Sequence, residues 1–237
     1  MQIDIISAAP ELLKSPLENS IIGRAREAGL VNIRIHDLRE YSSDKHHKVD
    51  DYPYGGGGGM VLTPQPIFDC IESLQGKQSN EEVLFPTPDA PIFTQQDAVN
   101  LSLKKDIIIL CGHYKGVDQR VRDQLVTKEL SIGDYVLSGG ELPALVMIDS
   151  IVRLIPGALG DAQSALTDSF QDGLLGNPVY TRPADFRGHK IPEILQTGDH
   201  KRIEQWKHEQ AVEKTKKLRP DIYEKFLKEQ QNEEWQR

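Results

Sequence analysis

Short runs of β-branched residues alternate with segments of helical periodicity along the first half of the chain. The runs "IDIIS", "VNIRI", "EEVLF" and "DIIILCG" are typical of strands, and helical stretches such as "ENSIIGRAREAG" and "TPQPIFDCIESLQG" lie between them. Gly29 stands where a helix would end, and Thr63 and Pro64 stand where the next would begin. This alternation of strands and helices predicts an α/β fold in which helices cover a mostly parallel sheet.

Two glycine-containing loops follow predicted strands. In "CGHYKGVDQR", Gly112 and Gly116 lie between a strand and a helix. In "SIGDYVLSGGELPALVMIDSIVRLIPG" we expect a short strand, a turn at Gly139 and Gly140, and a long apolar helix starting near Glu141. Ligands of open α/β sheets bind at the carboxyl ends of strands, so these loops are candidate pocket walls, although a tight turn into a core helix also explains the glycine pair. The dinucleotide and P-loop patterns are absent, which excludes those ordinary nucleotide motifs.

Five consecutive glycines occur in "DDYPYGGGGGM", at residues 55–59. Such a run is either a flexible tether or a backbone that a ligand must approach closely. It precedes a predicted helix and does not join two domains, which disfavours the tether.

The charge balance argues against a protein that binds nucleic acid mainly through a high overall positive charge. The formal net charge is −8, whereas neutralising phosphates needs lysine and arginine. Basic residues cluster locally near the C-terminus, at Lys214, Lys216, Lys217 and Arg219, but nearly as many acids accompany them. The charge pattern alone therefore favours a solvated helix face with i,i+4 pairs.

Cysteine usage and hydropathy bear on the compartment. Cys70 and Cys111 match neither a disulfide framework nor a metal-ligand spacing, which favours a reducing environment. The segment "MQIDIISAAPELL" has no basic n-region, and no apolar run reaches the roughly 18 residues that a membrane span needs. We expect a soluble, cytoplasmic protein with no membrane partner.

The chain is expected to form two domains. The stretch "GALGDAQSALTDSFQDGL", residues 157–174, loses apolar periodicity and is typical of a functional loop or linker. It would separate an α/β domain, residues 1–156, from a helical domain, residues 175–237. In the latter, Asp199 is a candidate N-cap and Pro220 opens the last helix.

An ordered set of motifs covers essentially the whole chain. The glycine run is followed by "CGHYKGVDQR", "SIGDYVLSGGELPA", "RLIPGALG", "DSF", "YTRP" and "GDHKRIEQWK". Together these motifs resemble the bacterial tRNA (guanine-N1)-methyltransferases, the TrmD family of the SPOUT superfamily. The resemblance implies methyl transfer from S-adenosylmethionine to N1 of the guanosine at tRNA position 37, 3′ to the anticodon, when another guanosine precedes it.

The same resemblance has structural implications. It implies a deep trefoil knot in the N-terminal domain and a homodimer whose active sites span the interface. It also implies a small all-α C-terminal domain that grips the tRNA anticodon arm. Topology rules alone would not have predicted the knot, because they treat threading as essentially absent.

The resemblance puts the cofactor pocket on three loops, where close backbone approach to adenine explains the glycines. Tyr135 and Leu137 would wall the pocket. The implied cofactor-binding residues are Pro86, Thr87, Pro88, Gly112, Ile132, Gly133, Asp134, Tyr135, Val136, Leu137, Gly139, Gly140 and Pro143.

Methylation at guanine N1 needs a base, because N1 carries a proton that must leave before its lone pair can attack. Asp168 in "TDSF" matches the family's base, and Arg153 in "VRLIPG" is suited to stabilise negative charge on guanine O6. Without the resemblance, Asp168 would be interpreted as a helix cap and Arg153 as a helix-end residue. Asp168 lies in the predicted linker, which we expect to become ordered when tRNA binds.

The resemblance also assigns residues to the RNA. The glycine loop would face the guanosine that precedes the target, with Asp50 accepting hydrogen bonds from that base and Gly58 and Gly59 offering backbone groups. Ser164 would contact the target base. Gly58 replaces a proline or alanine that is common in the family, which should raise the entropy cost of ordering the loop.

Two positions depart from the family pattern. Lys115 and Gly176 stand where the family usually has acids, so a magnesium requirement is left open and no metal ligands are assigned. Three other functions compete with this interpretation: a SPOUT methyltransferase acting on another RNA such as rRNA, a non-enzymatic RNA-binding module, and Rossmann-like cofactor binding for another purpose. Loss of turnover with retained cofactor binding on removal of Asp168 would separate an enzyme from a binding module.

Overall fold

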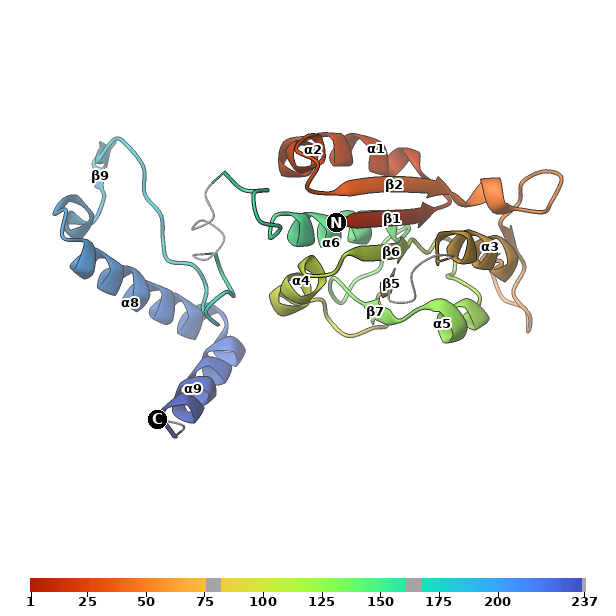
Figure 1. Cartoon of the computed structure of the whole chain (residues 1–237). Helices are drawn as coiled ribbons and strands as arrows, with labels where there is room; N and C mark the ends of the chain where they lie inside the picture. Colours follow the sequence, from red (N-terminus) through yellow and green to blue (C-terminus); the bar gives the residue numbers. More distant parts are fainter. Residues whose placement is uncertain (76–81, 161–167, 236–237) are drawn as a thin grey trace. The chain divides into compact units, whose positions relative to one another are not determined.

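The computed structural model describes residues 1–75, 82–160 and 168–235. The chain divides into two compact units, Met1–Gly160 and Asp161–Arg237. The first holds a covered sheet, and the second holds mainly helices (Figure 1).

A five-stranded parallel sheet forms the centre of the first unit. Its order is β2 (Asn32–Asp37), β1 (Gln2–Ser7), β6 (Asp106–Leu110), β5 (Glu82–Pro86) and β7 (Lys128–Leu130), and every neighbouring pair is parallel (Figure 1). The predicted parallel sheet is thus confirmed. All five strands end at one edge of the sheet, where the loops that follow them gather.

Helices cover both faces of this sheet because side chains alternate along each strand. Ile3, Ile5 and Ile109 point to one face, where α1, α2, α4 and α6 pack. Ile6 and Leu110 point to the other, where α3, α5 and the 3₁₀ helix η1 pack. The bounds are α1 (Glu11–Glu18), α2 (Ser20–Glu27), η1 (Leu38–Tyr41), α3 (Pro64–Gln75), α4 (Gln95–Ser102), α5 (Gln119–Leu125) and α6 (Glu141–Val152).

Several predicted helix boundaries are confirmed. Gly29 follows α2 with φ +71°, and its N–H donates to the carbonyl of Arg26 at 3.0 Å, as a C-terminal capping glycine does. Pro64 opens α3 and Glu141 opens α6. Each signal depends only on neighbouring residues.

The strand expected to begin the segment "SIGDYVL" lies earlier. β7 ends at Leu130, and Ser131 makes only an isolated bridge with Ile92. The Ser131 hydroxyl donates to the Gly133 carbonyl at 3.0 Å and accepts from the Gly133 N–H at 3.1 Å. These local side-chain hydrogen bonds compete with ladder pairing, and Gly133, at φ +150°, turns the chain away.

The glycine run forms the tip of a small antiparallel hairpin. β3 (Asp50–Asp51) pairs with β4 (Val61–Leu62), with Asp50 opposite Leu62. Four of the five glycines have positive φ, namely Gly55 (+84°), Gly56 (+79°), Gly57 (+112°) and Gly59 (+91°). The tip therefore requires a backbone that residues with side chains rarely adopt.

The second unit contains two long helices and a short hairpin. Asp199 caps α8 (His200–Leu218) by accepting from the N–H of Arg202 at 3.2 Å, and Pro220 opens α9 (Pro220–Trp235), as predicted. The remaining elements are the 3₁₀ helix η2 (Glu193–Gln196) and the antiparallel strands β8 (Asp185–Phe186) and β9 (His189–Lys190).

The hairpin corrects the expectation of an all-helical C-terminal part. Arg187 and Gly188, at φ +56° and +84°, form a two-residue turn that suits an antiparallel pair. Such short strands leave no hydrophobic period in the sequence. None of the helices in the described ranges has the length and apolarity to span a bilayer.

Candidate active site

A cavity of about 290 Å³ lies at the carboxyl ends of β5, β6 and β7. Most of the residues expected to bind a cofactor line it, although Asp134 does not, because the chain turns at Gly133 just before it. The predicted residues on its wall are Pro86, Thr87, Pro88, Gly112, Ile132, Gly133, Tyr135, Val136, Leu137, Gly139, Gly140 and Pro143.

Main-chain hydrogen bonds join the loops of this cavity. The N–H of Gly140 donates to the carbonyl of Gly112 at 2.7 Å, and His113 forms an antiparallel bridge with Gly139. The N–H of Thr87 donates to the carbonyl of Leu130 at 3.0 Å. The rim is therefore fixed by backbone contacts between segments that follow three different strands.

The paired glycines leave no room for side chains. A Cβ on Gly140 would lie 2.8 Å from the nitrogen of Gly112 and 2.9 Å from the Cα of Cys111. A Cβ on Gly139 would lie 2.4 Å from Oε2 of Glu141 and 2.6 Å from Nδ1 of His113. This close packing explains why the chain uses glycine at both positions, because a tight turn alone would not require two glycines.

A buried carboxylate stands behind the rim. Glu141, the first residue of α6, is 1% exposed and accepts a hydrogen bond at Oε1 from the buried hydroxyl of Ser7 at 2.7 Å. Its Oε2 lies 3.6 Å from Nδ1 of His113, which lines the cavity. Sequence analysis missed this cluster, because its members come from β1, the loop after β6 and α6, and carry no shared motif.

The outer rim is apolar and exposed. Tyr135, Val136 and Leu137 line the cavity yet remain 54%, 82% and 38% exposed. Tyr114 is 47% exposed, and its ring packs edge-on against His113 with centroids 5.0 Å apart. Apolar side chains thus surround a backbone-lined interior, a composition that suits a ligand with a flat ring system.

A network of charges lies at one side of the cavity. Arg122 of α5 contacts Asp89 at 3.0 Å and Glu129 at 2.6 Å. Hydrogen bonding to Glu129, and also to Asp89, raises the pKa of Arg122. A hydrogen bond from Thr87, together with the Arg122 contact, holds the pKa of Asp89 below its usual range despite partial burial. These charges compensate one another.

The glycine hairpin is anchored beside the cavity. The N–H of Lys115 donates to the carbonyl of Met60 at 2.9 Å, and the N–H of Leu62 donates to the carbonyl of Gly116 at 3.0 Å. A Cβ on Gly59 would lie 2.7 Å from Cγ of Lys115, so the lysine stem covers this glycine. The structure thus joins the glycine loop to the loop after β6, which sequence analysis treated separately.

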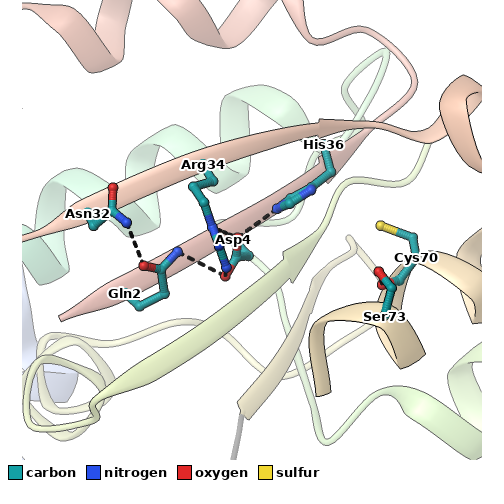
Figure 2. Close-up of polar contacts among 7 residues, drawn as sticks. All are labelled: Gln2, Asp4, Asn32, Arg34, His36, Cys70 and Ser73. Carbon is teal, nitrogen blue, oxygen red and sulfur yellow. Dashed lines mark hydrogen bonds and ion pairs between the residues drawn. The ribbon is translucent and has the colours of Figure 1, made fainter. Parts of the chain in front are cut away.

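A second polar cluster crosses β1 and β2 (Figure 2). The Asp4 carboxylate accepts from Nε of Arg34 at 2.7 Å and from Nε2 of His36 at 2.6 Å, and Gln2 donates to it at 3.0 Å. Burial raises the pKa of Asp4, but the hydrogen bonds from His36, Arg34 and Gln2 outweigh this and lower it to about 2. We interpret this cluster as structural, because none of these residues lines the cavity.

Comparison with known proteins identifies the family. Residues 1–225 match the family model described as tRNA (Guanine-1)-methyltransferase TrmD. The chain belongs to this family. A tRNA (guanine-N(1)-)-methyltransferase of Christiangramia forsetii is 58% identical over 222 residues, which cover 94% of this chain and 98% of that protein. The protein of the same name from Bacteroides thetaiotaomicron is 54% identical over 224 residues, covering 94% and 100%.

The two residues that sequence analysis expected to be catalytic belong to different units of this TrmD family member. Arg153 follows the last turn of α6, half-buried, and its N–H donates to the carbonyl of Asp149 at 3.2 Å. Asp168 belongs to the second unit, where its carbonyl accepts from the N–H of Gln171 at 3.4 Å. Ser164 lies outside the described residues.

The segment after Asp168 is held against α8. Gly176 donates its N–H to Oγ of Ser169 at 2.8 Å, and its carbonyl accepts from Nζ of Lys214 at 2.8 Å. The N–H of Leu175 donates to the buried hydroxyl of Thr215 at 2.8 Å. Gly176 therefore has a structural role in this chain.

In the part of this family member that the structure describes, potential metal ligands do not gather. Within the described residues, His, Cys, Asp and Glu nowhere form a group of three or more that could hold a metal ion. Cys70 and Cys111 are both buried, and burial raises the pKa of each thiol, which makes them poor ligands and nucleophiles.

Proposed function

We propose that this chain transfers a methyl group from S-adenosylmethionine to N1 of the guanosine at tRNA position 37 and requires a guanosine before it. The observation that carries the proposal is the cavity at the carboxyl ends of β5, β6 and β7, bounded by three loops and adjoining the glycine hairpin. Family membership supplies the methyl donor and the class of RNA.

The cavity fits an adenosine-containing methyl donor. Its volume of about 290 Å³ is near the lower end of the range for small-molecule sites, roughly 300–1,000 Å³, and its outer rim is open. Close packing at Gly139 and Gly140 leaves peptide groups on the wall, which can hydrogen-bond a base edge without charged side chains. When bound, the donor supplies a methyl group on a positively charged sulfur.

The chain's own residues would prepare the guanine. We assign Asp168 as the base that takes the N1 proton, which leaves the N1 lone pair free to attack the methyl carbon. Negative charge then spreads onto guanine O6, where the guanidinium of Arg153 stabilises the transition state more than the ground state. Ser164 would contact the target base.

The glycine hairpin would read the preceding guanosine. Gly58 and Gly59 lie at its tip, and Asp50 is half-buried at its base, paired with Leu62. A carboxylate accepts readily from the N1–H and N2–H groups of guanine, and a tip without side chains allows close approach of the main chain. The anchoring of this hairpin beside the cavity supports a site at which the two guanosines lie together.

The domain roles and assembly follow the family. Residues 1–156 would form a knotted catalytic domain and residues 157–174 a linker carrying the base, while residues 175–237 would hold the anticodon arm. Exposed apolar residues support a homodimer, since Leu142 and Val146 are one helical turn apart on α6 and are 55% and 47% exposed. Magnesium forms no part of the proposal, because Lys115 and Gly176 stand where the resemblance leads us to expect acidic residues.

Methyl transfer from labelled S-adenosylmethionine tests the proposal. Asp168→Asn should retain cofactor binding and lose turnover by at least about 100-fold, whereas Asp123→Asn, an exposed acid on α5, should retain both. A tRNA transcript in which the preceding guanosine is changed should lose most of the label. Label in rRNA but not in tRNA would replace the proposed substrate, and undiminished turnover by Asp168→Asn would remove the assigned base.

A further inference from the structure

We propose that Lys115 binds the carboxylate at the amino-acid end of the cofactor and thereby links occupancy of the cavity to the glycine hairpin. The inference rests on the proposed cofactor site. It assigns to Lys115 a role in holding the cofactor that the comparisons with known proteins do not supply.

The charges on the cavity wall single out Lys115. Arg122 is compensated by Asp89 and Glu129, and His113 lies beside the buried carboxylate of Glu141. Lys115 also lines the cavity, and it makes no ion pair or side-chain hydrogen bond with any residue in the described ranges. Its ammonium is thus a cation available to an anion in the cavity.

The cofactor's chemistry supplies one anion. Its amino-acid end carries a carboxylate and an ammonium group at neutral pH, whereas its adenosine end is uncharged. The backbone-lined loops at Gly112, Gly139 and Gly140 suit the adenine, so a charge contact is needed only at the other end. A lysine there attracts the carboxylate, whereas an acid would attract the ammonium.

The stem of Lys115 connects this contact to the hairpin. A Cβ on Gly59 would lie 2.7 Å from Cγ, 3.5 Å from Cδ and 3.3 Å from Cε of Lys115, so the stem lies along this glycine. The backbone N–H of Lys115 also holds Met60. Fixing the ammonium on a carboxylate would fix the stem and so reduce the freedom of the hairpin tip that faces the RNA.

Calorimetry with two unreactive ligands tests the assignment. S-adenosylhomocysteine carries the carboxylate, and 5′-methylthioadenosine lacks the whole amino-acid end. Lys115→Met should lower the affinity for S-adenosylhomocysteine by about 5–10-fold and change the affinity for 5′-methylthioadenosine by less than about 2-fold. Lys115→Arg should restore most of the loss, and Lys105→Met, an exposed lysine away from the cavity, should change neither affinity.

The outcomes separate this inference from the proposed function. Equal affinities of wild type and Lys115→Met for the homocysteine ligand would overturn the role of Lys115 alone. Equal losses for both ligands would mean that Lys115 only supports the loop, which also overturns it. Failure of the wild-type chain to bind either ligand would overturn the proposed cofactor site and, with it, the inference.

Discussion

Nδ1 of His113 lies 3.6 Å from Oε2 of Glu141, a carboxylate that is 1% exposed. His113 lies in the loop after β6 and Glu141 is the first residue of α6, while Ser7 of β1 donates to the other carboxylate oxygen at 2.7 Å. A buried carboxylate is costly unless it is hydrogen-bonded, and the Ser7 hydroxyl supplies such a bond. The arrangement therefore ties β1 to the loop after β6 and to the start of α6.

The first prediction separates the charge of Glu141 from its hydrogen bond. Glu141→Ala leaves the Ser7 hydroxyl without this acceptor and should lower the free energy of unfolding by about 1–3 kcal/mol. Glu141→Gln keeps an acceptor and should lower the free energy of unfolding less. Both variants should weaken binding of S-adenosylhomocysteine, because each removes the carboxylate that lies 3.6 Å from His113 on the cavity wall. Urea unfolding and calorimetry measure the two effects, and equal destabilisation by both variants would contradict the prediction.

The second prediction concerns the glycine hairpin. Gly57 has φ +112°, so Gly57→Ala should strain the tip and reduce turnover on tRNA without changing cofactor affinity. At Gly58 an added Cβ would meet no atom within 4 Å, and the backbone is not in the positive-φ region. Gly58→Ala should therefore stabilise the folded chain by about 0.4–1 kcal/mol. Steady-state kinetics and thermal unfolding of the pair provide the comparison. Identical behaviour of the two variants would show that the tip conformation is unimportant.

The third prediction concerns stability at low pH. The pKa of Asp4 is about 2 in the folded chain against an ordinary value of 3.8, so its carboxylate stabilises the fold above pH 3.8. That contribution, about 2 kcal/mol, should be lost as the pH falls from roughly 5 towards 2.

Asp4→Asn isolates this contribution. The difference in unfolding free energy between wild type and variant should shrink steadily as the pH falls through the same window, because the wild-type carboxylate becomes increasingly protonated. Urea unfolding at several pH values measures it. A difference that stays constant from pH 6 to pH 2.5 would mean that Asp4 does not titrate in this way.

The fourth prediction concerns assembly. Val146→Glu puts a charge on the exposed apolar face of α6 and should convert the proposed dimer to monomers, with loss of methyl transfer. Leu103→Glu is a matched control, because Leu103 is 79% exposed but precedes β6, at the amino end of the strands. Sedimentation velocity reports the state of each variant. A wild-type chain that sediments as a monomer while remaining active would contradict the proposal.

Local signals in the sequence predicted the boundaries that depend on a few adjacent residues. Gly29, Pro64 and Asp199 act through backbone conformation or a neighbouring N–H, so their effect can be inferred without knowing the fold. The hairpin of β3 and β4 could not be predicted this way, because strands of two residues have no period.

Contacts between distant segments were not predictable from spacing. Ser7 and Glu141 meet only because α6 packs against the face of the sheet that contains β1. Lys115 meets Gly59 only because two loops are anchored together. The cavity-lining glycines were correctly grouped through family resemblance. Composition alone would have left them as turns.

The main-chain rim of the cavity has a consequence for inhibition. A compound that hydrogen-bonds to the peptide groups around Gly112, Gly139 and Gly140 contacts atoms that every amino acid carries, so a single substitution cannot remove them. Replacing Gly140 would drive a new side chain into the backbone of Cys111 and Gly112, which cannot move aside without breaking the rim. A substitution at these positions that prevents inhibitor binding would therefore also disrupt the cavity itself.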